Sequence, residues 1–252
     1  MGEVRVWLLP GSRYDSAEKS VAVLPVGSLE RHGDHLPLGT DTILADHVAR
    51  RVAERLGAHL FPPVWYGSSR GLRRFPGTID VDDDAFEKYV ASVLEEIVRN
   101  GYRFVLVING HGGNSATLRR AAKRVAYRTG AVIVVVDWWR DVAQEERKRL
   151  FSSPGHAGED ETSAVLHVVP EAVDMAAASD YIPPDLPRIN VYSPTVDEKL
   201  YPRAVMGSPS RASADKGRAW LEAVVSEIVE VFEKVKRLLV GPGGFEPPTT
   251  RL

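Results

Sequence analysis

Cysteine is absent from the 252 residues of this chain. Disulfide bonds and thiolate metal sites are therefore excluded, and any metal ion would be bound through nitrogen and oxygen ligands. No apolar run approaches the length of about 18 residues that a membrane-spanning helix needs, and the first residues lack the pattern of a secretory signal. We therefore expect a cytoplasmic protein that does not bind a membrane.

An excess of charge of one sign is also lacking. The formal net charge is -2 and the pI is about 6.4, so there is no global basic field that would attract nucleic acid or anionic lipid. Hydrophobic residues make up 44% and charged residues 26%, which is enough apolar material for a core. We expect one domain over residues 1–240, a flexible Gly- and Pro-rich tail over 241–252, and a small molecule as the substrate.

Short apolar runs alternate with amphipathic helical patterns along the chain. The patterns predict strands at 21–26, 103–108 and 131–137, and helices at 42–56, 83–99, 115–129, 159–168 and 214–239. This alternation predicts an α/β fold with a mostly parallel sheet and helices on both faces. In such sheets, ligands bind at the carboxyl ends of the strands.

The densest polar motif, E-R-H-G-D-H-L-P-L-G-T-D, follows the first predicted strand at residues 30 to 41. Glu30 and His32 are two positions apart, so in an extended segment they point the same way, and Asp41 can fold back to join them. Two carboxylates and an imidazole suit divalent Zn, Mn or Fe. The alternative is that Asp41 caps a helix beside a surface pair of Glu30 and His32.

A second motif, N-G-H-G-G-N, follows the strand predicted at 103–108. Its glycines would let the backbone approach a ligand closely, next to His111. The alternative is a glycine-rich turn with an incidental histidine. A phosphate-binding loop is disfavoured, because neither of the usual glycine-rich phosphate patterns is present.

A third motif, G-H-A-G-E-D-E-T-S, spans residues 155 to 163. His156 precedes a predicted helix, and Glu159, Asp160 and Glu161 fall in its first turn. His156 and Glu161 are close enough for one to bind metal and the other to carry protons. Acidic residues also favour the positive end of a helix dipole, which explains Glu159 and Asp160 about as well as a chemical role does.

At these motifs the sequence resembles the creatininase (creatinine amidohydrolase) family. The resemblance covers most of the chain and includes F-P-G-T-I at 75 to 79 and a weaker M-G-S-P at 206 to 209. It implies an α/β fold with parallel strands and a centre of two divalent metal ions per subunit, with zinc as the first choice and manganese or iron as alternatives. It also implies a homo-oligomer, with a hexamer favoured.

The resemblance further implies which residues bind the ions. In creatininase itself a glutamate two positions after the strand-end histidine completes the second metal, whereas this chain has Gly113 there. In members with N-G-H-G-G-N the resemblance implies that the glutamate of E-T-S takes this place, which is Glu161 here. The implied ligands are Glu30, Asp41 and His111 for one ion, with Asp41 bridging to a second ion that His32 and Glu161 bind.

The implied reaction is hydrolysis of a non-peptide carbon–nitrogen bond, in a cyclic amide or a formamide, by a water activated between two ions. His156 matches the family's catalytic histidine and would exchange a proton with the leaving nitrogen. Glu159 is predicted to orient His156 or the water. Trp138 and Trp139 follow a strand end and are candidates to flank a planar substrate, although core packing explains at least one of them as well.

The loop Y-G-S-S-R-G-L-R-R, residues 66 to 74, departs from the family pattern, because Leu72 stands where many members have histidine. Arg73 and Arg74 are predicted to bind a carboxylate or phosphate of the substrate, and a solvated basic loop is the alternative. The substrates considered are creatinine, a formamide on a pyrimidine ribosyl phosphate of flavin or deazaflavin synthesis, and a short peptide terminus. A non-catalytic metal- or nucleotide-binding subunit is the alternative from another class.

Overall fold

The computed structural model describes residues 3–184, 191 and 193–239. Within them, four parallel strands form one sheet in the order β2-β1-β3-β4. The strands are β1 (Val21–Val26), β2 (His59–Leu60), β3 (Phe104–Asn109) and β4 (Val132–Asp137). Their register aligns Val26 with Asn109 and Asn109 with Asp137. The three long strands therefore end level, and the loops that follow them leave from one edge of the sheet.

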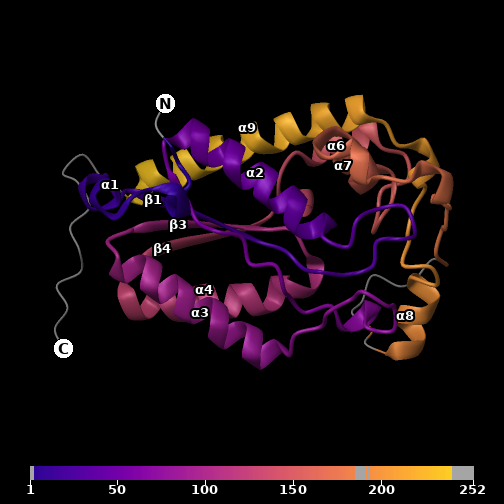
Figure 1. The fold of residues 1–252 in the computed structure, drawn as a ribbon, viewed down its shortest axis with the longest axis horizontal. Coiled ribbons are helices and arrows are strands. Elements are labelled where there is room, and N and C mark those ends of the chain that lie inside the picture. The colour runs from indigo at the N-terminus through magenta and orange to yellow at the C-terminus, as the bar shows by residue number, and fades with distance from the viewer. Residues whose placement is uncertain (1–2, 185–190, 192, 240–252) are drawn as a thin grey trace.

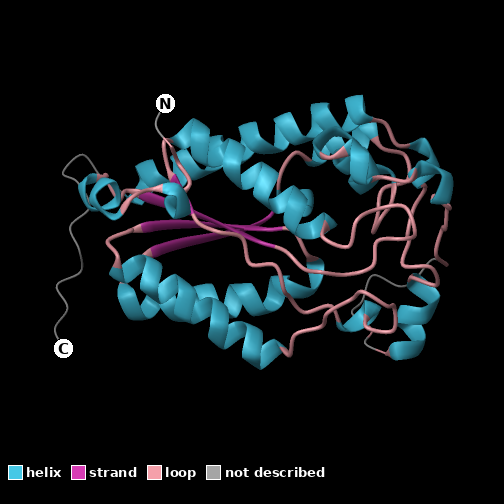
Figure 2. Cartoon of the chain, in the orientation of Figure 1, coloured by secondary structure: helices cyan, strands magenta, loops and turns pink. Residues whose placement is uncertain are grey.

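Helices cover both faces of this sheet (Figure 1). The α-helices of the described residues are α1 (Gly11–Ser16), α2 (Thr40–Leu56), α3 (Asp83–Arg99), α4 (Ser115–Thr129), α5 (Trp138–Asp141), α6 (Gln144–Leu150), α7 (Glu159–Val168), α8 (Pro194–Leu200) and α9 (Ala214–Leu239). Alternate residues of β1 and β3 face opposite sides, so Val23 and Leu106 pack in the cluster with α2, α7 and α9. Leu24 and Val107 pack in the cluster with α3 and α4. Figure 2 shows the resulting layers, with the sheet between two groups of helices.

The predicted α/β fold, with a parallel sheet and helices on both faces, is confirmed. The predicted strands agree with the observed ones to within one residue at each end, and α2 begins two residues before its predicted start. The domain bounds 1–240 and the tail 241–252 stay predictions, because residues 240–252 lie outside the described residues. Among the described residues, no helix combines the length and the apolar character needed to cross a membrane.

The start of α2 lies against the end of β3, and a glycine makes this approach feasible. A Cβ atom on Gly110 would lie 2.2 Å from the backbone oxygen of Asp41, which is closer than any real contact. Only glycine therefore fits at this position without a shift of the backbone. The contact brings Asp41 beside the loop that carries His111.

Candidate metal centre

The five predicted ligands converge at the carboxyl edge of the sheet. They are Glu30 and His32 after β1, Asp41 at the start of α2, His111 after β3, and Glu161 in the first turn of α7. The ligands form two sets, and within each set the three donor atoms lie within 4.8 Å of one another. One set is Glu30, Asp41 and His111, and the other is His32, Asp41 and Glu161. Asp41 belongs to both sets, so the two sets adjoin.

The two oxygens of Asp41 face different histidines. Its Oδ1 lies 3.1 Å from Nε2 of His32, and its Oδ2 lies 3.0 Å from Nδ1 of His111. On the outer sides, Glu30 Oε1 lies 3.3 Å from His111 Nδ1, and Glu161 Oε2 lies 3.7 Å from His32 Nε2. The order of side chains is thus carboxylate, imidazole, carboxylate, imidazole, carboxylate.

Several of these buried atoms have no hydrogen-bond partner among the described residues. They are Glu30 Oε2, His32 Nε2 and Asp41 Oδ2. Buried polar atoms are normally hydrogen-bonded, and leaving one unpaired costs about 1–3 kcal/mol. Unpaired buried donor atoms that lie this close together are arranged as the ligands of a metal ion. This set of nitrogen and oxygen donors fits a divalent cation.

Backbone carbonyls orient the two histidine rings. Nδ1 of His32 lies 3.2 Å from the carbonyl oxygen of Glu30, and Nε2 of His111 lies 2.7 Å from that of Ser68. A carbonyl oxygen only accepts, so the nitrogen facing it carries the proton. The other nitrogen of each ring faces the carboxylates, and in the neutral ring its lone pair is available to a metal ion, which is the arrangement that metal-binding histidines use.

Electrostatics at the site favour bound positive charge. Burial opposes protonation of His32, but the carboxylates of Asp41, Glu161 and Glu30 together outweigh burial and raise the pKa of His32 to about 9. Burial likewise opposes protonation of His111, and Glu30 and Asp41 raise its pKa well above the usual range. Burial raises the pKa of Glu161, so the ionised form of that carboxyl group needs a nearby cation. Bound metal ions would supply the positive charge that protons on His32 and His111 otherwise supply.

Asparagine side chains that the sequence analysis did not single out hold the His111 loop. Asn109 accepts from the backbone N–H of His111 at 3.1 Å and donates to its carbonyl at 2.8 Å, while Asp137 accepts from Asn109 at 2.7 Å. Asn114 accepts from the N–H of Ser68 at 2.9 Å. The signal was present in the motif, because the two asparagines bracket N-G-H-G-G-N.

His156 lies beside the ligands. Its Nε2 donates to the carbonyl of Arg31 at 2.9 Å, and its Nδ1 lies 3.7 Å from Glu30 Oε1. Burial, followed by the charge of His32, lowers the pKa of His156 to about 4, so the ring is neutral near pH 7. Nδ1 can therefore accept a proton. Glu30, His32 and His156 also form a third set of donors, so the geometry equally permits His156 to bind an ion.

Glu159 points away from His156. Its side chain is 1% exposed, and its Oε2 accepts from the backbone N–H groups of Ser152 and Ser153, both at 2.8 Å. Its Oε1 accepts from Lys216 at 2.7 Å. These contacts tie the loop before α7 to α9.

The two tryptophans after β4 differ in their surroundings. Trp138 is 2% exposed and packs in the core, with its ring centroid 4.9 Å from that of Trp220. Trp139 is half-buried, and a Cβ atom on Gly112 would lie 3.9 Å from its ring. Trp139 thus borders the His111 loop, whereas Trp138 is not exposed to a substrate.

The two arginines that were predicted to bind an anion, Arg73 and Arg74, differ in their side-chain contacts. Arg73 is exposed, and its side chain forms no hydrogen bond or ion pair with a described residue. Arg74 donates to the carbonyls of Gly71, Asp197 and Tyr201, at 3.0, 3.2 and 2.5 Å. Tyr201 itself lies beside His156, with the two rings perpendicular and 5.5 Å apart. No periodic pattern in the sequence marks Tyr201, which lies between Pro194 and Pro202.

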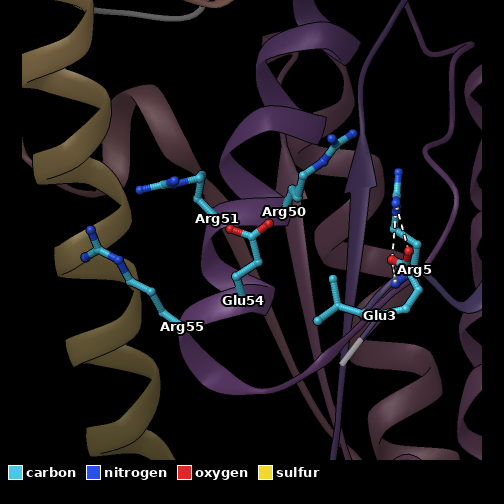
Figure 3. A pocket seen from close by; sticks show the side chains of 7 residues that line it. Glu3, Arg5, Arg50, Arg51, Glu54 and Arg55 are labelled. Carbon is cyan, nitrogen blue, oxygen red and sulfur yellow. Dashed lines mark hydrogen bonds and ion pairs between the residues drawn. The ribbon is translucent and has the colours of Figure 1, made fainter. Parts of the chain in front are cut away.

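A hollow of about 620 Å³ lies elsewhere, between the N-terminal segment and α2 (Figure 3). Its lining consists of Glu3, Val4, Arg5, Arg50, Arg51, Glu54 and Arg55. Arg50 and Arg55 are 9 and 14 positions beyond Asp41, which is roughly 14–21 Å along α2. Carboxylates neutralise its arginines, as in the pairs Arg5–Glu3 and Arg55–Glu222. This hollow is therefore separate from the metal-ligand cluster.

An α/β domain that gathers carboxylates and imidazoles at the carboxyl edge of a parallel sheet has the architecture of a metal-dependent hydrolase. Residues 12–232 match the Creatininase family, described as creatinine amidohydrolase. The chain belongs to the creatininase family.

Curated relatives and solved structures agree with this family. Creatinine amidohydrolase of Pseudomonas putida is 31% identical over 238 residues, which are 87% of this chain and 91% of the relative. Mycofactocin precursor peptide peptidase of Mycobacterium ulcerans is 34% identical over 244 residues, 88% of this chain and 87% of the relative. A solved structure described as "Creatininase Mn" superposes with a TM-score of 0.83 at 29% identity, covering 93% of this chain and 99% of that one.

These likenesses confirm the predicted family and the predicted enzyme class, an amidohydrolase that acts on carbon–nitrogen bonds. Divalent metal binding fits the family, because the solved creatininases include a manganese form and a Zn–Zn form. Together with the clustered donor atoms, this supports divalent ions as cofactors of this chain.

Proposed function

We propose that this chain hydrolyses a non-peptide amide or formamide bond of a small molecule at a centre of two divalent ions. One observation carries the proposal: the two oxygens of Asp41 lie 3.1 and 3.0 Å from ring nitrogens of two different histidines, His32 and His111. A carboxylate in this position can bind one ion through each oxygen. Asp41 is therefore the proposed bridge.

The remaining ligands divide between the two ions. Glu30 and His111 complete the first site with Asp41, and His32 and Glu161 complete the second. Zinc is the first choice because mixed imidazole and carboxylate donors suit it, and manganese and iron are the alternatives. Ions held there would polarise the amide carbonyl and make water a stronger nucleophile.

His156 is the proposed proton carrier. Its Nδ1 faces Glu30 while Arg31 holds its other nitrogen, so the ring is fixed and one lone pair is available. A neutral imidazole there can take a proton from the attacking water and pass it to the leaving nitrogen. Glu159 is better placed to hold the loop before α7 than to orient His156, because Lys216 and two backbone N–H groups occupy its oxygens.

Metal analysis tests the two-ion proposal. Purified protein supplemented with Zn, Mn and Fe is expected to bind about two divalent ions per chain. The variant Asp41→Asn is expected to lose both ions together, because each depends on the bridge. Asp46→Asn is the matched control: it lies on the same helix and its carboxylate pairs with Arg50. A folded wild-type protein that takes up no metal would instead favour the non-catalytic binding subunit.

The substrate is the second question. A cyclic amide such as creatinine or a ring formamide is the first proposal, with Arg73 as a candidate to meet an anionic group. A short peptide terminus is the second, because the peptidase of Mycobacterium ulcerans is 34% identical over nearly the same span. Mass spectrometry on creatinine, a phosphorylated formamide, its dephosphorylated form and short peptides would decide. Release of amino acids alone would replace the first proposal with the second.

Two finer proposals concern the cellular location and the oligomeric state of the protein. We propose a cytoplasmic location and a homo-oligomer, with a hexamer favoured. Light scattering on the purified full chain measures the assembly, and a monomeric mass would contradict it. Cell fractionation tests the location.

A further inference from the structure

Tyr201 presents an unused donor beside the metal-ligand cluster. Its ring meets the ring of His156 edge-on at 85°. Burial, followed by the charges of Glu30, Asp197 and Glu161, raises the pKa of its phenol. Its hydroxyl forms no hydrogen bond with residues 3–184, 191 or 193–239. The contrast is Tyr181, whose hydroxyl donates to the carbonyl of Lys199 at 2.7 Å.

Backbone hydrogen bonds fix the segment that carries Tyr201 to the loop of His32 and to the loop of His156. The carbonyl of Ala204 accepts from Gly33 at 2.8 Å, beside His32. The N–H of Met206 donates to the carbonyl of His156 at 2.7 Å. Ala204 itself is fully buried with a φ of 51°, a conformation that non-glycine residues adopt only when their surroundings enforce it. The backbone of the segment therefore holds Tyr201 beside the metal-ligand cluster.

Arg74 fastens the same segment from the other side. Its guanidinium donates to the carbonyl of Tyr201 at 2.5 Å and to that of Asp197 in α8 at 3.2 Å. A third bond, to Gly71 at 3.0 Å, holds the guanidinium on its own loop. Figure 1 shows this loop running beside α8. Arg74 thus cross-links two segments more than 120 positions apart, and three backbone carbonyls accept hydrogen bonds from its guanidinium.

We propose that Tyr201 is a substrate-contacting residue whose hydroxyl donates a hydrogen bond to the oxygen of the scissile amide, and that Arg74 is its positioning residue. The inference rests on the proposed function, since it assumes an amide carbonyl at the metal centre. A phenol is a neutral donor near pH 7, and a fixed donor aimed at the oxygen that gains negative charge stabilises the transition state. Arg74 acts in this account through Tyr201 and not by binding a substrate anion.

Acetohydroxamate binding to the cobalt-loaded full chain tests the contact without knowledge of the substrate. Co²⁺ absorbs visible light and takes zinc sites, and acetohydroxamate presents a charged oxygen to a metal centre. Tyr201→Phe is expected to weaken binding about tenfold, as loss of one hydrogen bond does, with unchanged cobalt content. Tyr127→Phe makes the same chemical change at a side chain of α4 that is 86% exposed, and it is expected to bind like wild type.

A double-mutant cycle tests the role of Arg74. Arg74→Ala should weaken acetohydroxamate binding by a factor similar to that of Tyr201→Phe, and the double variant should lose little more. Arg203→Ala is the matched control, because Arg203 is exposed in the same segment and has no described ion pair. Wild-type affinity in Tyr201→Phe at full cobalt content would overturn the contact, and additive losses would overturn the role of Arg74. Failure of the wild type to bind Co²⁺ would overturn the proposed function itself, and this inference with it.

Discussion

A methyl group at position 113 should disrupt the metal centre. A Cβ atom on Gly113 would lie 2.0 Å from the carbonyl oxygen of Ser68 and 2.6 Å from Nε2 of His111. That carbonyl is the acceptor that orients the His111 ring, at 2.7 Å. Gly113→Ala must therefore push the carbonyl aside and break the bond. For the same reason, Gly113→Glu would not restore the ligand that creatininase itself has at this position.

The expected cost has two parts. Forcing an extra carbon into a packed site costs about 1–3 kcal/mol. Losing the hydrogen bond from His111 costs about 0.5–1.5 kcal/mol. The free energy of unfolding of Gly113→Ala should therefore fall by about 1.5–4.5 kcal/mol. Its metal affinity should fall as well, because the ring of a ligand is no longer held.

Urea unfolding and metal titration measure both effects. Gly112→Ala is the matched control, since a Cβ there would have only the ring of Trp139 nearby, at an ordinary 3.9 Å. The control should keep the wild-type urea midpoint and metal content. If Gly113→Ala matched the control in both measurements, the claim that the Ser68 carbonyl holds the His111 ring for metal binding would be refuted.

Two further predictions concern stability. Burial raises the pKa of Glu159. Lys216 and the backbone N–H groups of Ser153 and Ser152 together outweigh burial, so this pKa is lowered overall. Glu159→Gln should lower the free energy of unfolding by about 1–3 kcal/mol in urea yet retain the metal, and metal loss would contradict a loop-holding role. Burial first, then His167 and two arginines, lower the pKa of His47 from 6.5 to about 4. The unfolded state then binds more protons between these values, so stability falls as the pH falls from 6.5 toward 4. His47→Gln should flatten this dependence in urea unfolding at pH 5 and 7, and an unchanged slope would contradict it.

Parallel topology made the position of the site predictable. Motifs that follow β1 and β3 must leave the same edge, because the strands end level at Val26 and Asn109. The sequence shows both the strands and the motifs, so the approach of Glu30, His32 and Asp41 to His111 followed from chain order alone. Chain order could not show the distances.

Neighbouring residues on one helix were harder to separate. Glu159 and Glu161 both start α7, but residues two apart point in nearly opposite directions on a helix. Contact with Lys216 of α9 decides that Glu159 faces away from the cluster. Contact with Trp220 likewise decides that Trp138 enters the core. Such choices depend on tertiary packing, which a local pattern does not contain.

Anomalous diffraction from crystals of the full chain grown with zinc would test the central claim most directly. The account predicts two zinc peaks per chain, one among Glu30, Asp41 and His111 and the other among His32, Asp41 and Glu161. A single peak, or peaks that do not share Asp41, would contradict it.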